Sequence, residues 1–298
     1  MKQNEEQKTG MNIQWYPGHM TKTRRMMEED LKLVDAVCEI LDARIPISSR
    51  NPDIDAICGK KPRMVILNRI DMADADLVSR WSAYFKNKGM AVIRTDCKSR
   101  KGINTFAPAV RQLLSEKLQR YAEKGQVGRP LKLMVVGIPN VGKSTFINQI
   151  AGRKGAKAEN RPGVTRGKQW VTVERGLELL DTPGILWPKF EDPEVGLKLS
   201  YTGAVKDDVV DIETLAMHLM ELLATYYPAA LEQRYKITVP EHAQGLELLE
   251  LCGRKRGMLI SGGEIDIERM SRVLLEEYRS GKLGRFTLEM PEKAEEQD

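Results

Sequence analysis

The stretch GIPNVGKST, residues 137–145, decides the fold of this chain. It follows an apolar run, LKLMVVG (131–137), which predicts a buried strand, and it leads into a helical pattern from about 143 to 151. A glycine-rich turn between such a strand and a helix, ending in Gly-Lys-Ser, is the pattern of a loop that binds nucleotide phosphates. The alternative is a glycine-rich strand-to-helix turn without a ligand. We therefore expect an α/β protein with a phosphate loop.

The residues of the phosphate loop have separate expected roles. The backbone N–H groups of the loop and of the helix N-terminus would surround the β-phosphate. Lys143 would reach the β- and γ-phosphates, and the hydroxyl of Ser144 would ligate Mg²⁺. The expected nucleotide-contacting residues here are Asn140, Val141, Gly142, Lys143, Ser144 and Thr145.

Two further segments predict contacts to the γ-phosphate and the magnesium ion. DTPG (181–184) ends another apolar run, so Asp181 would hold Mg²⁺ through water and the N–H of Gly184 would contact the γ-phosphate. Between the motifs, RPGVTRG (161–167) supplies Thr165, whose hydroxyl could complete the Mg²⁺ shell once a γ-phosphate orders the loop. A plain turn for DTPG and an ordinary loop threonine at 165 are the alternatives.

The base-reading element lies earlier in the chain, in NRID (68–71). Asp71 could accept hydrogen bonds from guanine, and Asn68 would tie this loop to the phosphate loop. Arg69 stands where such elements usually have Lys, but its stem or its guanidinium could still lie on the purine face. TDCKSRKGI (95–103) resembles a second element that contacts the guanine carbonyl, through Cys97 and Lys98. A polar strand-to-helix loop would explain that segment equally.

In this chain the two base-contacting elements come first, followed by the phosphate loop and then by the two switch segments. In the usual GTPase order the phosphate loop and the switches come first and the base-contacting elements last, so this chain is a circular permutation. Such a rearrangement preserves the site because domain termini usually lie close together. The segment GQVGRP (125–130) would be the join, and the cut falls just after DTPG. The second switch then runs directly into the C-terminal part of the chain.

The remaining pattern predicts two domains. Apolar runs predict six strands, at 36–43, 63–68, 90–94, 131–137, 169–174 and 177–181. Helical patterns precede the first strand (19–34), lie between the second and third (74–88), and follow the third (103–124) and the fourth (143–151). Helical patterns at 214–227, 241–252 and 263–282 predict a second, helical domain. The fold class is thus α/β, a permuted P-loop GTPase domain with a six-stranded, mostly parallel sheet, followed by a small all-helical domain. The expected boundaries are 1–10 disordered, 11–190 GTPase domain, 191–290 helical RNA-binding domain and 291–298 disordered.

Composition narrows the class further. The chain has 298 residues and 47 Lys or Arg against 42 Asp or Glu, a net charge of +5 that favours a polyanionic partner without proving one. No signal peptide and no run of membrane-spanning length is visible, so we expect a cytoplasmic protein without a membrane partner. The four cysteines lie far apart, which indicates reduced thiols and no metal cluster.

The permuted motifs, together with WYPGHM (15–20), LDARIP (41–46), GRKRG (253–257) and RSGKLGRFTLE (279–289), resemble the ribosome biogenesis GTPase A, or YlqF-like, family of circularly permuted GTPases. The resemblance covers nearly the whole chain. It implies late assembly of the large ribosomal subunit, binding to its rRNA, and GTP hydrolysis that is slow alone and stimulated by the subunit. We expect GTP or GDP as ligand and a monomeric protein.

The glutamine that orients the attacking water in many GTPases is absent from this sequence. Ile185 occupies the position of the water-orienting Gln of many GTPases and cannot hydrogen-bond a water. The resemblance nominates His19 as the catalytic residue instead; the alternative is that Gly18-His19 only caps a helix. Asn140 occupies the position that supplies an oxygen to K⁺ in potassium-activated GTPases, or else it only shapes the loop.

Two groups of charges stay open. Asp42-Ala43-Arg44 is explained by an internal ion pair or turn cap as well as by a function. In the helical domain, an RNA-facing surface and ordinary solvated helix faces are both compatible with Arg254, Lys255, Arg256, Arg269, Arg272, Arg279, Lys282 and Arg285. The main alternative to a GTP-hydrolysing assembly factor is a scaffold that binds rRNA under the control of the nucleotide and whose hydrolysis of GTP is incidental. An RNA-modifying enzyme is a poor third, since no second catalytic constellation is visible.

Overall fold

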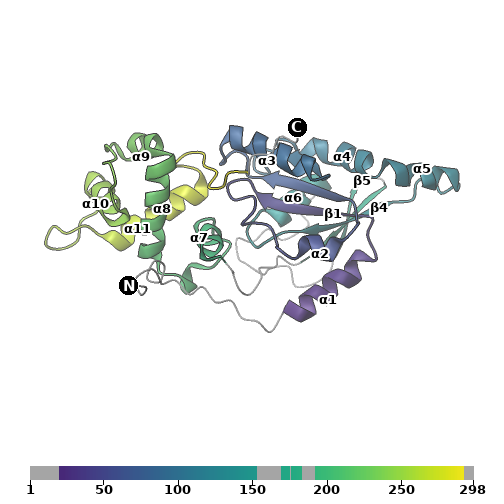
Figure 1. The fold of residues 1–298 in the computed structure, drawn as a ribbon, viewed down its shortest axis with the longest axis horizontal. Coiled ribbons are helices and arrows are strands. Elements are labelled where there is room, and N and C mark those ends of the chain that lie inside the picture. Colours follow the sequence, from purple (N-terminus) through teal and green to yellow (C-terminus); the bar gives the residue numbers. More distant parts are fainter. Residues whose placement is uncertain (1–19, 153–168, 175, 183–191, 292–298) are drawn as a thin grey trace, which may run out of the picture. The chain divides into compact units, whose positions relative to one another are not determined.

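The computed structural model describes residues 20–152, 169–174, 176–182 and 192–291. These residues divide into two compact units (Figure 1). The GTPase unit holds the described residues up to 182 together with residues 289–291, and the helical unit holds residues 192–288. The boundary expected near residue 190 lies outside the described residues, as do residues 1–10 and 292–298, where disorder was expected.

A six-stranded sheet in the order β3-β2-β1-β4-β6-β5 forms the centre of the GTPase unit. Its neighbouring strands are all parallel except β5 and β6, which are antiparallel. This confirms the mostly parallel sheet expected from the sequence. The strands are β1 (Ala36–Asp42), β2 (Arg63–Asn68), β3 (Ala91–Arg94), β4 (Leu131–Val136), β5 (Gln169–Glu174) and β6 (Leu177–Asp181).

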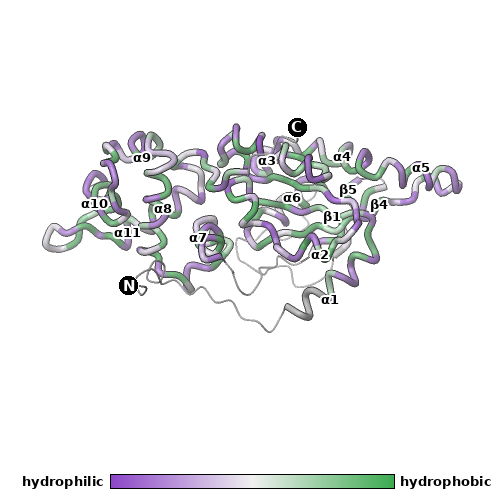
Figure 2. Tube along the Cα trace, viewed as in Figure 1, coloured by the Kyte–Doolittle hydropathy of each residue, from purple (hydrophilic) through white to green (hydrophobic). Residues whose placement is uncertain are grey.

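Helices cover both faces of this sheet. Val37 of β1 packs with α1 and α2, and Leu41, four residues along the same strand and therefore on the same face, packs with α3. On α4 and α6, Phe106 and Phe146 meet edge to face with ring centroids 5.2 Å apart. All seven residues of β1 are buried, and Figure 2 shows the central strands as mostly hydrophobic. The helices of this unit are α1 (Met20–Leu31), α2 (Ile54–Cys58), α3 (Ala75–Asn87), α4 (Phe106–Leu113), α5 (Ser115–Glu123) and α6 (Lys143–Ala151).

The prediction of one continuous helix over 103–124 is wrong, because the structure divides this range into three shorter helices. A short 3₁₀ helix, η2 (Ile103–Thr105), leads into α4, and α4 ends at Leu114, whose φ of −108° and ψ of 22° are not helical. Leu114 is buried while α5 beyond it has no buried residue. The break lets α4 pack on the sheet and leaves α5 at the surface.

The helical unit has its own apolar core. Its helices are α7 (Pro193–Tyr201), η3 (Asp207–Val209), α8 (Ile212–Tyr226), α9 (Pro228–Tyr235), α10 (Gly245–Lys255) and α11 (Ile267–Ser280). Leu219 of α8, Leu248 of α10 and Leu274 of α11 are fully buried together in this core. Asp266 caps the start of α11 by accepting from the N–H of Arg269, and Gly281 ends it at a φ of 76°. The sequence patterns did not predict α7 and α9, nor α2 in the first unit.

The last described residues return to the GTPase unit. The carboxylate of Glu289 accepts from the N–H of Ile47 at 2.6 Å, from the N–H of Ser48 at 3.1 Å, and from the Ser48 hydroxyl. Its backbone carbonyl accepts from the indole N–H of Trp81 at 3.0 Å. The segment is therefore bound to the loop that follows β1 and to α3. Among the described helices, none has the length and apolar character that a membrane span needs.

Candidate functional site

The phosphate loop has the backbone that its sequence predicts. β4 ends at Val136, α6 begins at Lys143, and Asn140 and Gly142 between them have φ angles of 59° and 97°. A Cβ on Gly142 would lie 2.4 Å from Nδ2 of Asn68. Gly142 is thus needed both for its left-handed backbone and for the close approach of a second loop. Asn tolerates the left-handed region better than most residues, which gives Asn140 a structural role beside any role as a ligand.

Asn68 joins the base-reading loop to the phosphate loop. Its Nδ2 donates to the carbonyl of Val141 at 2.9 Å, and its Oδ1 accepts from the hydroxyl of Thr95 at 3.1 Å. Asn68 is only 2% exposed, so these bonds form inside the protein. The expected link from Asn68 to the phosphate loop is confirmed. Thr95 was not predicted, although it begins the segment that was singled out for guanine contacts.

The guanidinium of Arg69 does not point toward a base site, as the sequence had allowed, but contacts other groups of the protein. Its guanidinium donates to the carbonyl of Asn140 and lies 3.6 Å from the carboxylate of Asp42, so it is held between β1 and the phosphate loop. Burial, opposed by the charge of Asp42, lowers the pKa of Arg69. This is a correction: the guanidinium is not free to stack on a purine, and only the aliphatic stem is left for that contact.

The pair Asp42 and Arg44, left open by the sequence, is a buried ion pair. Arg44 donates to Asp42 from its backbone N–H at 3.0 Å, from Nε at 2.9 Å and from Nη2 at 2.7 Å. Although burial acts in the opposite direction, Arg44 and Arg69 together lower the pKa of Asp42. The pair stabilises the end of β1, next to Arg69 at the nucleotide loops.

Asp71 has a half-buried carboxyl group, consistent with a hydrogen-bond acceptor for a base. Burial, and then the neighbouring carboxylate of Asp96, raise the pKa of Asp71. The loop carrying it is joined to the end of β3, since the N–H of Ile70 donates to the carbonyl of Thr95 at 3.3 Å. A guanine edge would offer Asp71 donors that favour its ionised form.

The second base-contacting segment is only partly turned toward a ligand. Cys97 is 5% exposed, and burial raises the pKa of its thiol to about 12, so the side chain is an apolar group of the interior. Only the backbone of Cys97 remains for a base contact. Lys98 is exposed, and its N–H donates to Asp96 at 2.8 Å, which fixes the turn.

Lys143 and Asp181 meet inside the site. The ammonium of Lys143 is 2.6 Å from the carboxylate of Asp181 and also donates to the carbonyl of Thr182. Ser144 and Thr145 lie half-buried in the first turn of α6, so the site offers a hydroxyl and a carboxylate oxygen. Among the described residues, no group of three or more His, Cys, Asp or Glu could hold a metal alone. Mg²⁺, which takes few protein oxygens and completes its shell with phosphates and water, fits this donor set.

Four residues of the expected site lie outside the described residues: His19, Thr165, Gly184 and Ile185. Their roles stay predictions.

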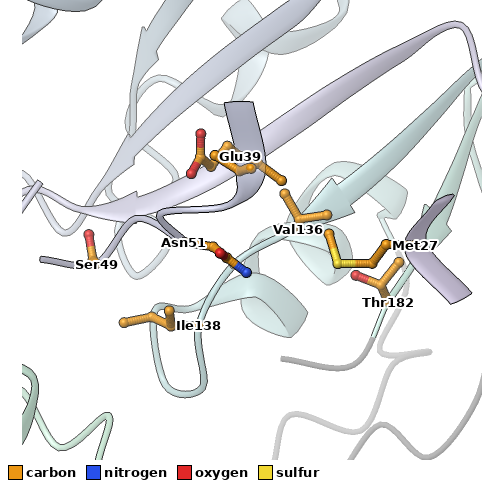
Figure 3. Close-up of a pocket in the computed structure, with 9 residues that line it drawn as sticks. Met27, Glu39, Ser49, Asn51, Val136, Ile138 and Thr182 are labelled. Carbon is orange, nitrogen blue, oxygen red and sulfur yellow. The ribbon is translucent and has the colours of Figure 1, made fainter. Parts of the chain in front are cut away.

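A small cavity lies beside the start of the phosphate loop, between Glu39 of β1, Val136 of β4 and Thr182 (Figure 3). Its volume is about 20 Å³, enough for one water molecule but far too small for a nucleotide. Glu39 is paired there with Arg50 at 3.2 Å and Arg63 at 2.9 Å, yet burial still raises its pKa. This cavity is therefore not a nucleotide site.

Two of the eight basic side chains singled out in the helical unit bind groups of the unit itself, whereas Arg254, Lys255, Arg269, Lys282 and Arg285 are exposed. Arg256 lies 2.9 Å from Glu277, and Arg279 binds Asp207 at 2.7 Å and also donates to the carbonyls of Ser200 and Tyr201. Arg256 and Arg279 thus stabilise the unit itself, which corrects their place in the expected RNA-facing surface. Arg272 pairs with Glu268 at 2.8 Å on an exposed helix face.

The permuted order of the base and phosphate loops on this sheet defines a circularly permuted P-loop GTPase. Residues 132–236 match the family model described as 50S ribosome-binding GTPase. Ribosome biogenesis GTPase A of Bacillus cereus is 48% identical over 96% of this chain and 97% of its own length. The chain therefore belongs to the ribosome biogenesis GTPase A family.

More distant relatives agree with this assignment. Ribosome biogenesis GTPase A of Thermotoga maritima is 32% identical over 94% of this chain and 95% of its own length. Among solved structures, the GDP-bound TM YlqF has a TM-score of 0.66 at 29% identity, covering 90% of this chain and 100% of that chain. The GNP-bound YlqF from T. maritima has a TM-score of 0.64 at 28% identity, with 92% and 100% covered.

Proposed function

We propose that this protein binds and hydrolyses GTP and acts in late assembly of the large ribosomal subunit, its nucleotide state controlling its association with the pre-ribosomal particle. The observation that carries the proposal is the bond from Asn68 to Val141, which joins a base-reading loop to a phosphate loop in a chain of this family. The family description, a 50S ribosome-binding GTPase, supports the choice of partner.

The chain's own groups suit each part of the nucleotide. The N–H groups at the start of α6 point out of the helix N-terminus, where a β-phosphate is favoured. Lys143, now bound to Asp181, is within side-chain reach of phosphates over the same loop. Asp71 accepts from the guanine edge, and the stem of Arg69 lies along the purine.

Magnesium, held by Ser144 with Thr165 and, through water, by Asp181, would neutralise charge on the phosphates. His19 orients the attacking water in place of a glutamine, since Ile185 cannot. Asn140 supplies an oxygen to K⁺ beside the phosphates. Without a glutamine, we expect slow hydrolysis by the protein alone.

The decisive experiment measures GTP turnover with and without purified large ribosomal subunits. We expect at least tenfold stimulation, about 1.4 kcal/mol of barrier. Co-sedimentation with GTP, GDP and a non-hydrolysable analogue then tests control by the nucleotide. Binding that depends on the nucleotide without any stimulated turnover would favour the nucleotide-gated scaffold instead.

A further inference from the structure

A broad groove of about 1020 Å³ lies on the GTPase unit, away from the nucleotide loops. Its walls are the segments that precede β2 and β3, the helix α5, and residues 124–129 ahead of β4. These segments lie at the amino ends of the parallel strands, whereas Asn68, the phosphate loop and Asp181 lie at the carboxyl ends. The groove is therefore a second site, at the opposite ends of the strands of the same sheet.

The groove concentrates positive charge. Eight Lys or Arg side chains line it against two carboxylates, an excess of six, while the whole chain of 298 residues has an excess of only five. The rest of the sequence is thus close to neutral. Charge gathered on one face in this way produces a local positive potential that attracts polyanions.

Five of these eight cations have no acidic partner among the described residues, and four of the five are exposed. Among the described residues, no ion pair involves Lys60, Lys88, Lys124 or Arg129, all of which are exposed. By contrast, Lys117 pairs with Asp35. In the helical unit, Arg256 and Arg279 are satisfied by carboxylates and carbonyls.

An aromatic ring lies among these charges. The side chain of Tyr121, half-buried on α5, has the guanidinium of Arg129 4.9 Å from its ring centroid and the ammonium of Lys117 5.7 Å away. Arg129 is also held by a 3.1 Å bond to Gln126. Aromatic rings and guanidinium planes next to cations are the surfaces on which nucleic-acid bases stack.

We propose that this basic groove, defined by Lys60, Lys88, Lys124, Arg129 and Tyr121, binds the phosphate backbone of RNA. The proposal deepens the proposed function, on which it rests, by placing an rRNA contact on the GTPase unit. An acidic protein is a poorer occupant, because a protein interface needs an apolar centre. Here Leu114 is buried, and Leu113 and Met90 are only partly exposed.

The test uses two double charge reversals in the full-length protein. Lys88→Glu with Lys124→Glu changes the groove, and Lys32→Glu with Lys86→Glu is the matched control, since these are exposed lysines of the same unit outside the groove. Both variants change the net charge equally. The probe is a 20-base-pair RNA hairpin, with poly-glutamate as competitor, and the affinity is measured over a range of salt concentrations.

We expect the groove variant to bind the hairpin at least about tenfold more weakly, and its salt dependence to be shallower by about 1.5 in the log–log slope, the loss of two phosphate contacts. The control should bind almost as the unaltered protein does. Unstimulated GTP turnover and the thermal midpoint should be unchanged in both, which shows that both fold.

Equal losses in the two variants would mean that net charge acts rather than this groove, and would overturn the proposal. Displacement of the hairpin by poly-glutamate at matched charge concentration would point to an acidic protein and overturn it as well. Absence of GTP turnover or of subunit binding in the unaltered protein would instead refute the proposed function, so the two failures are distinguishable.

Discussion

The carboxyl group of Asp71 lies in surroundings that disfavour its ionised form in the free protein. Burial and the carboxylate of Asp96 both raise its pKa, so its ionised form is disfavoured until donors are supplied. Guanine N1–H and its 2-amino group are such donors. Asp71 lies on a loop that Asn68 ties to the phosphate loop, and we therefore expect base selection to depend on it.

The first prediction concerns base specificity. Asp71→Asn removes an acceptor and places a donor against N1–H and the 2-amino group, so GTP should bind at least ~2 kcal/mol more weakly, about thirtyfold. Xanthosine triphosphate carries an oxygen where guanine has the 2-amino group, and its affinity should rise. Competition binding with GTP, ATP and xanthosine triphosphate measures this, and ATP should bind poorly to both proteins. Equal GTP affinity in the variant would show that NRID does not read guanine.

The second prediction follows from the raised pKa of Asp71. The ionised carboxylate is the form that accepts from guanine, so GTP affinity should decline as the pH falls through this raised pKa, at a higher pH than the ~4 of an ordinary aspartate. The phosphates of GTP also titrate, but they do so equally for Asp71→Asn. The difference between the two proteins in binding against pH isolates the carboxylate, and parallel curves would contradict its role.

The third prediction concerns the residue that orients water. His19→Ala should leave GTP affinity almost intact while subunit-stimulated turnover falls by roughly 10²-fold or more, because a water-positioning group is lost. Single-turnover hydrolysis with large subunits is the measurement. If turnover is unchanged, His19 serves only as a helix cap.

At the scale of elements, the approach of two loops at Gly142 is the most demanding contact of the site. Gly142→Ala would press a Cβ against Asn68, whereas Gly152→Ala, at the other end of α6, has a positive φ but nothing within 4 Å. In both variants the left-handed backbone lowers the stability of the folded protein by about 1 kcal/mol, but only Gly142→Ala also displaces Asn68.

We therefore expect Gly142→Ala to abolish measurable GTP binding and Gly152→Ala to retain it, with a small loss of thermal stability in each. Calorimetric titration with a non-hydrolysable GTP analogue compares them. Similar affinities would mean that the close packing of the two loops is dispensable.

The contact of Glu289 with the loop after β1 is a second feature at this scale. Glu289→Ala removes the acceptor of the N–H groups of Ile47 and Ser48; the N–H of Ser48 is buried, and leaving it unsatisfied costs about 1–3 kcal/mol. We expect the urea midpoint of the GTPase unit to fall, followed through tryptophan fluorescence, to which Trp81 contributes beside three other tryptophans; the indole of Trp81 binds the carbonyl of Glu289. A midpoint equal to that of Met290→Ala, an exposed neighbour, would contradict this role.

The sequence predicted these elements unevenly, for physical reasons. β1 and β2 could be predicted because a strand covered on both faces is apolar throughout, and the phosphate loop because its glycine pattern is local. The break at Leu114 could not, since the apolar spacing runs through it. The local spacing of Asp42 and Arg44 allowed an ion pair as one alternative, but only side-chain geometry decides for it. The contact of Glu289 with Ser48 spans 241 residues and leaves no local pattern.

For the whole molecule, the permutation separates two kinds of binding on one sheet. The nucleotide loops follow the carboxyl ends of the strands, and the basic groove lies at their amino ends, partly built from the join at residues 125–130. A GTPase with the usual chain order would have its termini where this join lies. Because of the permutation, a continuous charged surface lies where a GTPase with the usual chain order has its two termini.

The return of Glu289 to the GTPase unit also affects how the protein is made. Synthesis runs from the N-terminus, so the loop after β1 and Trp81 are translated early, whereas their partner appears only after the whole helical unit, residues 189–288. At roughly 5–20 residues per second, those hundred residues take about 5 to 20 seconds. During this interval the nascent GTPase unit lacks Glu289, so the contacts of that residue with Ile47, Ser48 and Trp81 can form only after the helical unit has been made.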